Sequence, residues 1–69
     1  MKTIDVRGLN CPEPVILVKR AMEKGEVDIE VISDANVAVE NITRLSNKMG
    51  YNIEVKELNG EFILKIVKK

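Results

Sequence analysis

The sequence lacks the side chains on which several classes of enzyme and metal site depend. It has no histidine and one cysteine, which excludes a Cys–His nucleophilic pair, a Cys-x-x-Cys dithiol and a Cys/His zinc site. No apolar run approaches the roughly 20 residues that span a bilayer, and residues 1–8 lack the apolar stretch of a signal peptide. We therefore expect a cytoplasmic protein with a reduced thiol, no membrane association, and no metal or cofactor.

Aromatic residues and net charge are also scarce. The chain has one Tyr and one Phe, and its 11 basic residues balance 11 acidic ones. A nucleic-acid-binding surface normally needs a basic stripe or stacking aromatics, so we expect no direct nucleic-acid binding. The 69 residues correspond to one domain, residues 1–69, whose aliphatic side chains must supply the core. We expect this domain to be a monomer.

Four segments are predicted to be strands and two to be helices. Apolar and polar residues alternate in three of the strands, and the fourth follows Asn59-Gly60, a strong hairpin signal. The strands are residues 2–6, 27–31, 51–55 and 61–67. The helices occupy residues 12–24 and a segment around 38–49, and Gly25 and Gly50 end them. The order β-α-β-α-β-β predicts an α+β fold, a two-layer α/β sandwich with a mixed four-stranded sheet and two helices on one face.

The apolar positions on these elements define a predicted core. On the helices they are Pro14, Leu17, Val18, Ala21, Met22, Ala38, Ile42, Leu45 and Met49. On the strands they are Ile4, Val6, Val27, Ile29, Val31, Tyr51, Ile53 and Val55. Either Ser33 or Asp34 is expected to cap the second helix.

The single cysteine lies in the stretch VRGLNCPEPV, between a glycine-containing turn and two prolines. Proline is favoured at the first helical position, so Pro12 predicts that Cys11 is the N-cap of the first helix. A helix N-terminus favours a thiolate. We expect the Glu13 amide to donate to the sulfur and Arg7 to add positive charge if the loop folds back, whereas the Glu13 carboxylate opposes ionisation.

Two interpretations of Cys11 follow from this local pattern. A lone cysteine is often small, buried core filler. A cysteine at an N-cap after a loop is instead exposed, and serine or aspartate would cap the helix better. A lone exposed thiolate needs no internal base to attack a sulfane sulfur, hold it as a persulfide and release it to an acceptor. Sulfur carriage is thus the thiol chemistry that the composition leaves possible.

The stretch DVRGLNCPEPV resembles the signature of the TusA/SirA-like sulfur-carrier family, in which Cys-Pro-x-Pro begins the first helix. Asp5, Gly8, Leu9 and Glu13 also match the family pattern, and the resemblance covers essentially the whole chain. The later stretch NVAVENITRLSNKMGYNIEV is closer to the SirA-like domain of YedF-type proteins. The resemblance implies that Cys11 carries the persulfide and that Pro12 and Pro14 flank it.

The family resemblance also implies partners and a role. A protein donor such as a cysteine desulfurase would supply sulfur, and a protein acceptor would take it toward tRNA thiolation or toward sulfur or selenium metabolism. The protein would be a sulfurtransferase-type carrier rather than a stand-alone enzyme. The candidate supporting or partner-contacting residues are Arg7, Gly8, Asn10, Pro12, Glu13 and Pro14. Two other classes remain: a binding or regulatory module with an incidental cysteine, and an RNA-contacting adaptor.

Overall fold

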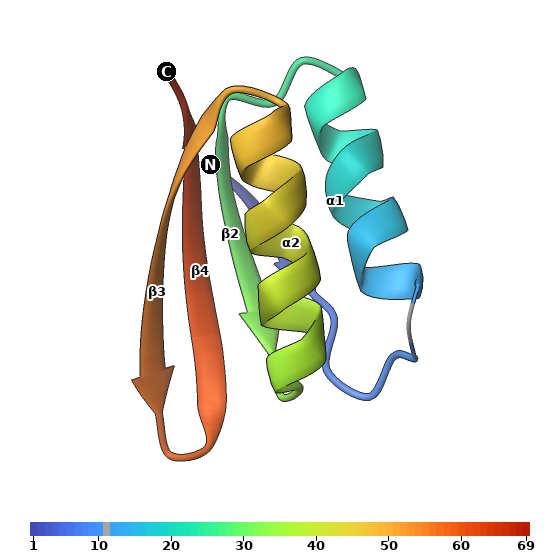
Figure 1. The fold of residues 1–69 in the computed structure, drawn as a ribbon, viewed down its shortest axis with the longest axis vertical. Helices are drawn as coiled ribbons and strands as arrows, with labels where there is room; N and C mark the ends of the chain where they lie inside the picture. The colour runs from blue at the N-terminus through green and yellow to red at the C-terminus, as the bar shows by residue number, and fades with distance from the viewer. Residues whose placement is uncertain (11) are drawn as a thin grey trace.

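The computed structural model describes residues 1–10 and 12–69 and contains the predicted elements in the predicted order (Figure 1). They are β1 (Lys2–Asp5), α1 (Glu13–Glu23), β2 (Asp28–Ser33), α2 (Asn36–Lys48), β3 (Tyr51–Leu58) and β4 (Glu61–Lys68). Each helix is followed by a cap residue and then by Gly25 or Gly50, as expected. Asn59 and Gly60 have φ values of 52° and 80°, the left-handed backbone that a two-residue type I′ hairpin requires.

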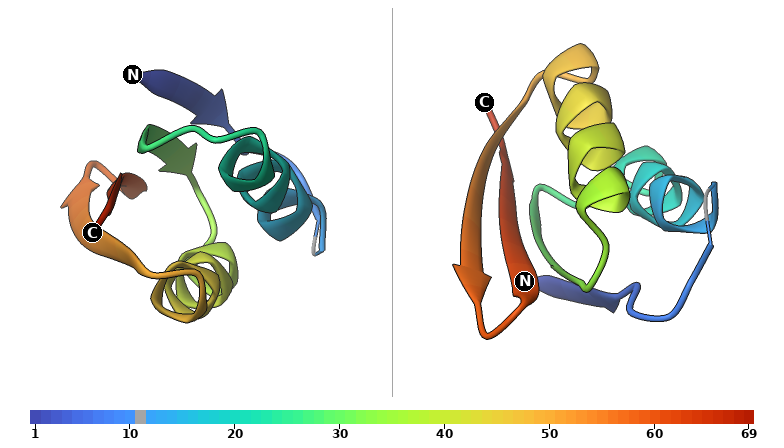
Figure 2. Two further views of the ribbon diagram at one scale, coloured as in Figure 1. Left: turned by 90° about the horizontal axis from the view of Figure 1, so that it is seen from above. Right: turned by 60° about the horizontal axis from the view of Figure 1, so that its bottom comes forward.

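The sheet is mixed and both helices cover the same face of it (Figure 2). The strand order is β1-β2-β4-β3. β1 runs parallel to β2, whereas β4 is antiparallel to both of its neighbours, β2 and β3. The parallel pair is joined through α1, as a βαβ crossover requires. The two-layer α+β prediction is therefore confirmed, and β4, the last strand in the sequence, lies inside the sheet.

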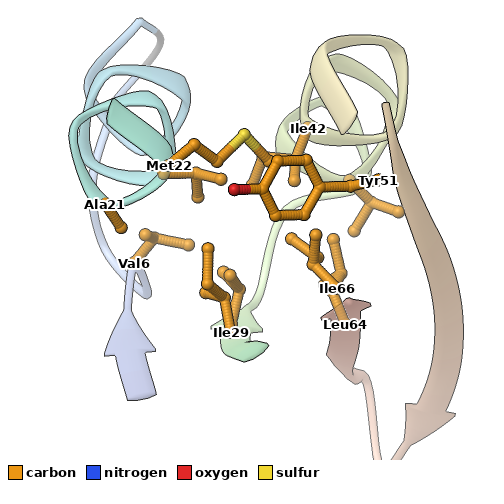
Figure 3. Close-up of a cluster of buried hydrophobic side chains, with 11 residues drawn as sticks. Val6, Ala21, Met22, Ile29, Ile42, Tyr51, Leu64 and Ile66 are labelled. Atoms are coloured by element: carbon orange, nitrogen blue, oxygen red, sulfur yellow. The ribbon is translucent and has the colours of Figure 1, made fainter. Parts of the chain in front are cut away.

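The core fills the space between the helices and the sheet (Figure 3). Met22 of α1 and Ile42 of α2 meet over Ile29 of β2, and the Tyr51 ring points from β3 across the core toward α1. The buried apolar side chains are Val6, Val18, Ala21, Met22, Ile29, Val31, Ala38, Val39, Ile42, Tyr51, Leu64 and Ile66. Most predicted core positions are confirmed, and β4 contributes two residues to the centre of the sheet that the sequence analysis did not assign.

Three predicted core positions are wrong. Val27 is 55% exposed, Val55 43% and Met49 37%. Val27 precedes β2, and Met49 is the cap residue after the last turn of α2. Val55 lies in the second half of β3, where every residue is exposed. Its cross-strand partner Leu64 is fully buried, but β3 is an edge strand of the sheet, whereas β4 lies inside it (Figure 1). Period-2 and period-3.6 patterns give the face of a residue, but they do not show where the opposing layer ends.

The cap of α2 also differs from the prediction. Ala35, with an extended backbone of φ −125° and ψ 126°, is the N-cap and makes no side-chain capping bond. Ser33 remains in β2 with its side chain buried, and its hydroxyl accepts from the Ala35 N–H and donates to the Ala35 carbonyl, each at 3.1 Å. Asp34 is also not the cap, because its carboxylate accepts a hydrogen bond from another loop. These bonds hold the β2–α2 connection beside the loop that follows β1.

Candidate functional site

The loop that contains the Cys-Pro-x-Pro motif follows β1 and is tied to the sheet at its first residues. The Val6 N–H donates to the Ile32 carbonyl at 2.9 Å and continues the β1–β2 ladder. The Leu9 N–H donates back to the Val6 carbonyl at 3.2 Å, which closes a β-turn. Gly8 is the third residue of that turn, with φ 76°, the position at which a type II turn requires positive φ. The turn predicted around Gly8 is confirmed.

A second anchor joins this turn to the connection between β2 and α2. The Gly8 N–H faces the Asp34 carboxylate, with its nitrogen 3.4 and 3.3 Å from the two oxygens. Hydrogen bonds to an ionised acceptor are stronger than neutral ones. The two loops at this end of the sheet are thereby linked across 26 residues of sequence. No local sequence signal identifies Asp34 as this partner.

The Arg7 side chain binds two carboxylates. Its guanidinium donates to Asp5 at 2.8 Å and 3.0 Å and to Glu61 of β4 at 3.0 Å. The Asp5 carboxylate also accepts from the Arg7 backbone N–H at 3.0 Å. Hydrogen bonds and charge from Arg7 lower the pKa of Asp5 from 3.8 to about 2, and the two carboxylates raise the pKa of Arg7.

The expected effect of Arg7 on the thiol concerns Cys11, which lies outside the described residues, so it stays a prediction. With Asp5 and Glu61 both bound, this exposed group of three side chains has more negative than positive charge. Its effect is to fasten the residue before Gly8 to β1 and to the start of β4. Arg7 thus holds the loop in place. The sequence alone does not reveal its contact with Glu61, because the two residues are far apart along the chain.

The start of α1 lies one residue later than predicted. Pro12 is the N-cap, with φ −99° and ψ 14° outside the helical region. Its carbonyl accepts the first helical hydrogen bond, from the Ile16 N–H at 3.1 Å. The prediction that Cys11 is the N-cap is therefore wrong, because the backbone turns helical only at Glu13. Pro14 takes the second helical position and is buried, and neither proline costs a helical bond there.

The Glu13 amide donates to the Asn10 carbonyl at 2.9 Å. The predicted bond from this amide to the Cys11 sulfur cannot be compared with the structure and stays a prediction. Cys11 itself lies outside the described residues. The residues next to it in the sequence, Asn10 and Pro12, are exposed, and so is Glu13.

The first turns of the two helices form a hollowed surface beside the motif. A small apolar hollow lies between Leu9, Pro14, Val37 and Ala38, and an open one of about 330 Å³ continues from Pro12 along α2 to Arg44 and Lys48. Val37 is 60% exposed. The structure therefore brings α2 residues to the motif that the sequence analysis did not include. An exposed apolar residue off the predicted core stripe, Val37, is the signal that points to them.

The structure brings most of the predicted site residues into one region. Arg7, Gly8 and Asn10 lie in the anchored loop, and Pro12, Glu13 and Pro14 follow at the start of α1. Among residues 1–10 and 12–69, no three His, Cys, Asp or Glu side chains form a group that could hold a metal ion. No helix in the same part of the chain is long and apolar enough to cross a membrane.

Comparison with known proteins gives consistent results. Residues 2–68 match the family described as sulfurtransferase TusA. A protein of Archaeoglobus fulgidus, provisionally named a sulfur carrier protein, is 40% identical over 75 residues, covering 100% of this chain and 97% of the relative. A similarly named protein of Methanocaldococcus jannaschii is 38% identical, covering 100% and 95%.

Among solved structures, the SirA-like protein of Desulfitobacterium hafniense is similar in both fold and sequence. It superposes with a TM-score of 0.87 at 38% identity and covers 97% of this chain and 96% of its own. The expected family is confirmed: the chain belongs to the TusA sulfurtransferase family.

Proposed function

We propose that this protein is a sulfur carrier that holds sulfane sulfur as a persulfide on Cys11. The observation that supports this most directly is the single cysteine of a TusA-family chain, placed in a Cys-Pro-x-Pro motif at the loop before α1. The other sulfur atoms belong to three methionines, whose thioethers cannot take up sulfur in this way. The relatives provisionally named as sulfur carriers favour the same role.

The proposed transfer conserves electrons. The Cys11 thiolate attacks the terminal sulfur of a persulfide on a donor protein such as a cysteine desulfurase. The new S–S bond forms on Cys11, the donor's S–S bond breaks, and the electron pair leaves on the donor's cysteine as a thiolate. An acceptor thiolate then removes the terminal sulfur by the same reaction. Neither step needs a histidine, a metal or an external oxidant.

The surroundings of the motif are suited to such an exchange between proteins. The chain on both sides of residue 11 is exposed, so a partner's cysteine has access to this part of the loop. The Gly8–Asp34 bond and the Arg7 ion pairs hold the preceding turn against the sheet. A fixed turn reduces the ordering that each partner must impose on binding. We therefore assign Arg7 and Gly8 to positioning, and Asn10, Pro12 and Glu13 to partner contact.

The route of the sulfur after Cys11 is part of the same proposal. The carrier would supply tRNA thiolation or sulfur or selenium metabolism through a protein acceptor. All of these routes share the persulfide step. Loading with selenocysteine as the desulfurase substrate, in parallel with cysteine, distinguishes a selenium carrier from a sulfur carrier by the mass of the added atom.

Intact mass spectrometry tests the proposal. The full chain is incubated with a cysteine desulfurase and cysteine, and we expect a mass increase of one or more sulfur atoms that a reductant removes. Cys11→Ser is the matched control, and it should take up no sulfur while its circular dichroism and Tm remain close to wild type. Equal masses for wild type and Cys11→Ser, across desulfurases of several types, would overturn the proposal in favour of a binding module.

A further inference from the structure

β1 is one of the two edge strands of the sheet, the other being β3. Within the described chain, β1 pairs with β2 alone, through a register that begins at Lys2 and Ile29. The Val6 N–H points to β2, and backbone groups alternate in direction along a strand. The N–H and C=O groups of Thr3 and Asp5 therefore face away from β2, toward the free edge. Such an edge is a template for an added strand.

The open edge borders a positively charged hollow. A cavity of about 420 Å³ lies between β1 and the C-terminal half of α1, with Ile4 and Leu17 in its lining. Its cations are Lys2 of β1, Arg20 of α1 and Lys24, the C-cap of α1. None of the three has an ion pair with any other residue that the structure describes. Two carboxylates also line it, Asp5 and Glu26.

These two carboxylates do not cancel the positive charge. Asp5 is paired with Arg7, which it shares with Glu61, so its negative charge is partly offset. Glu26 remains as one negative group against three unpaired cations. The hollow therefore carries a net positive charge next to a row of backbone donors and acceptors, and its apolar walls are supplied by Ile4 and Leu17.

We propose that this edge binds an extended, acidic segment of a partner protein. The segment would add to the sheet as a fifth strand beside β1, with its backbone bonded to Thr3 and Asp5. Its carboxylates would contact Lys2, Arg20 and Lys24. The occupant is a peptide because its backbone can pair with the free N–H and C=O groups of β1 while its carboxylates contact the cations of the hollow. Main-chain bonds then give affinity and alternate side chains give specificity.

The spacing of the cations predicts a pattern in the segment. Arg20 and Lys24 are one helical turn apart, about 5–6 Å along the axis. Alternate residues of a strand point to the same side and are about 6.6–7 Å apart. Two acidic residues separated by one other residue therefore match the two cations, and an apolar residue at another position on that side would meet Leu17. The proposed recognition pattern is Asp/Glu-x-Asp/Glu.

The hollow and the motif lie at different ends of α1. Pro12 caps the N-terminal end, whereas Arg20 and Lys24 belong to its last turn and its C-cap. A partner held at β1 therefore leaves the loop around the motif open to that partner's reactive group. The inference goes beyond the proposed function and does not depend on it, because the contacts involve neither Cys11 nor a persulfide.

Binding of a synthetic peptide to the ¹⁵N-labelled full chain tests the proposal by NMR. The probe is a short peptide in which glutamate alternates with valine. We expect saturable shifts of the Thr3 and Asp5 amides and no such binding by a peptide with lysine in place of glutamate. Lys24→Glu should weaken binding about tenfold, which corresponds to about 1.4 kcal/mol. Lys19→Glu makes the same change on an exposed α1 residue outside the hollow and should leave the affinity nearly unchanged.

Strand addition is tested separately from charge. N-methylation of the peptide at the alternate amides that would face β1 removes its donors but keeps its carboxylates, and we expect binding to be lost. Equal binding of the methylated peptide would overturn the strand-addition proposal, and so would an oligonucleotide of equal charge that binds as tightly. Cys11→Ser should bind the acidic peptide as wild type does. A failure of sulfur loading with intact peptide binding would therefore refute the proposed function alone.

Discussion

Substitution of Gly8 by alanine tests whether the turn before the motif affects the rate of sulfur loading apart from its effect on the stability of the fold. An ideal Cβ at Gly8 meets no atom within 4 Å, so the cost is conformational. The φ of 76° places an L-residue in the left-handed region, at about 1–2 kcal/mol. Alanine also lowers the conformational entropy of the unfolded chain, which stabilises the folded state by about 0.4–1 kcal/mol. We expect a net loss of about 1 kcal/mol and a decrease in Tm of about 4–8 °C.

Gly60 offers a matched control. It has a φ of 80° and also has no atom within 4 Å of an added Cβ, but it lies in the β3–β4 hairpin. Gly8→Ala and Gly60→Ala should therefore lose similar free energies of unfolding, measured by urea titration with circular dichroism. At a temperature at which both variants are folded, only Gly8→Ala should slow sulfur loading, because only this change strains the turn that leads to the motif.

Two results would refute this reasoning. If Gly8→Ala loads sulfur as fast as Gly60→Ala, the turn does not position the motif for the donor. If Gly8→Ala costs no stability while Gly60→Ala does, the loop accommodates the side chain by moving. Gly8→Asn provides a further check, because asparagine tolerates positive φ better than alanine. It should recover part of both the stability and the loading rate.

Two further predictions concern individual side-chain contacts. The Tyr51 hydroxyl donates to the Glu26 carbonyl at 2.7 Å, so Tyr51→Phe should lower the free energy of unfolding by about 1 kcal/mol; unchanged urea unfolding would contradict this contribution. The Asp5 carboxyl should titrate near pH 2 in an NMR titration, and in Arg7→Gln its pKa should return toward 3.8. Because the folded pKa is lowered, the stabilisation from this pair is present above pH 3.8 and is lost as the pH falls toward 2. An Asp5 pKa that stays near 2 in Arg7→Gln would refute the assignment.

Much of the fold could be predicted because local pattern and global structure agree. Alternation identified the strands, helical spacing identified the faces of α1 and α2, and Asn59-Gly60 fixed the hairpin. The errors occur where an element extends beyond its partner layer. Val55 has the parity of a core residue, but it lies on the edge strand β3 and is exposed. Local periodicity contains no information about such ends.

The site was less predictable, because its supports come from far along the chain. The motif itself is contiguous and was identified from the sequence. Its anchors, Asp34 and Glu61, are 26 and 54 residues from their partners. The helix start shifted by one residue for a local reason, since Pro12 serves as cap instead of first helical residue. The Glu13 amide is bonded to the Asn10 carbonyl, a contact that the sequence pattern does not reveal.

The position of β4 has a consequence for synthesis on the ribosome. β4 is the last strand to be made, yet it separates β2 from β3 in the sheet. Until residues 61–68 leave the exit tunnel, β3 has no partner strand and β2 has only the short β1. Glu61, which holds Arg7, belongs to the same late segment. The loop that precedes Cys11 therefore gains its last anchor only after residues 61–68 have emerged, so a shorter nascent chain does not present a finished site to its partners.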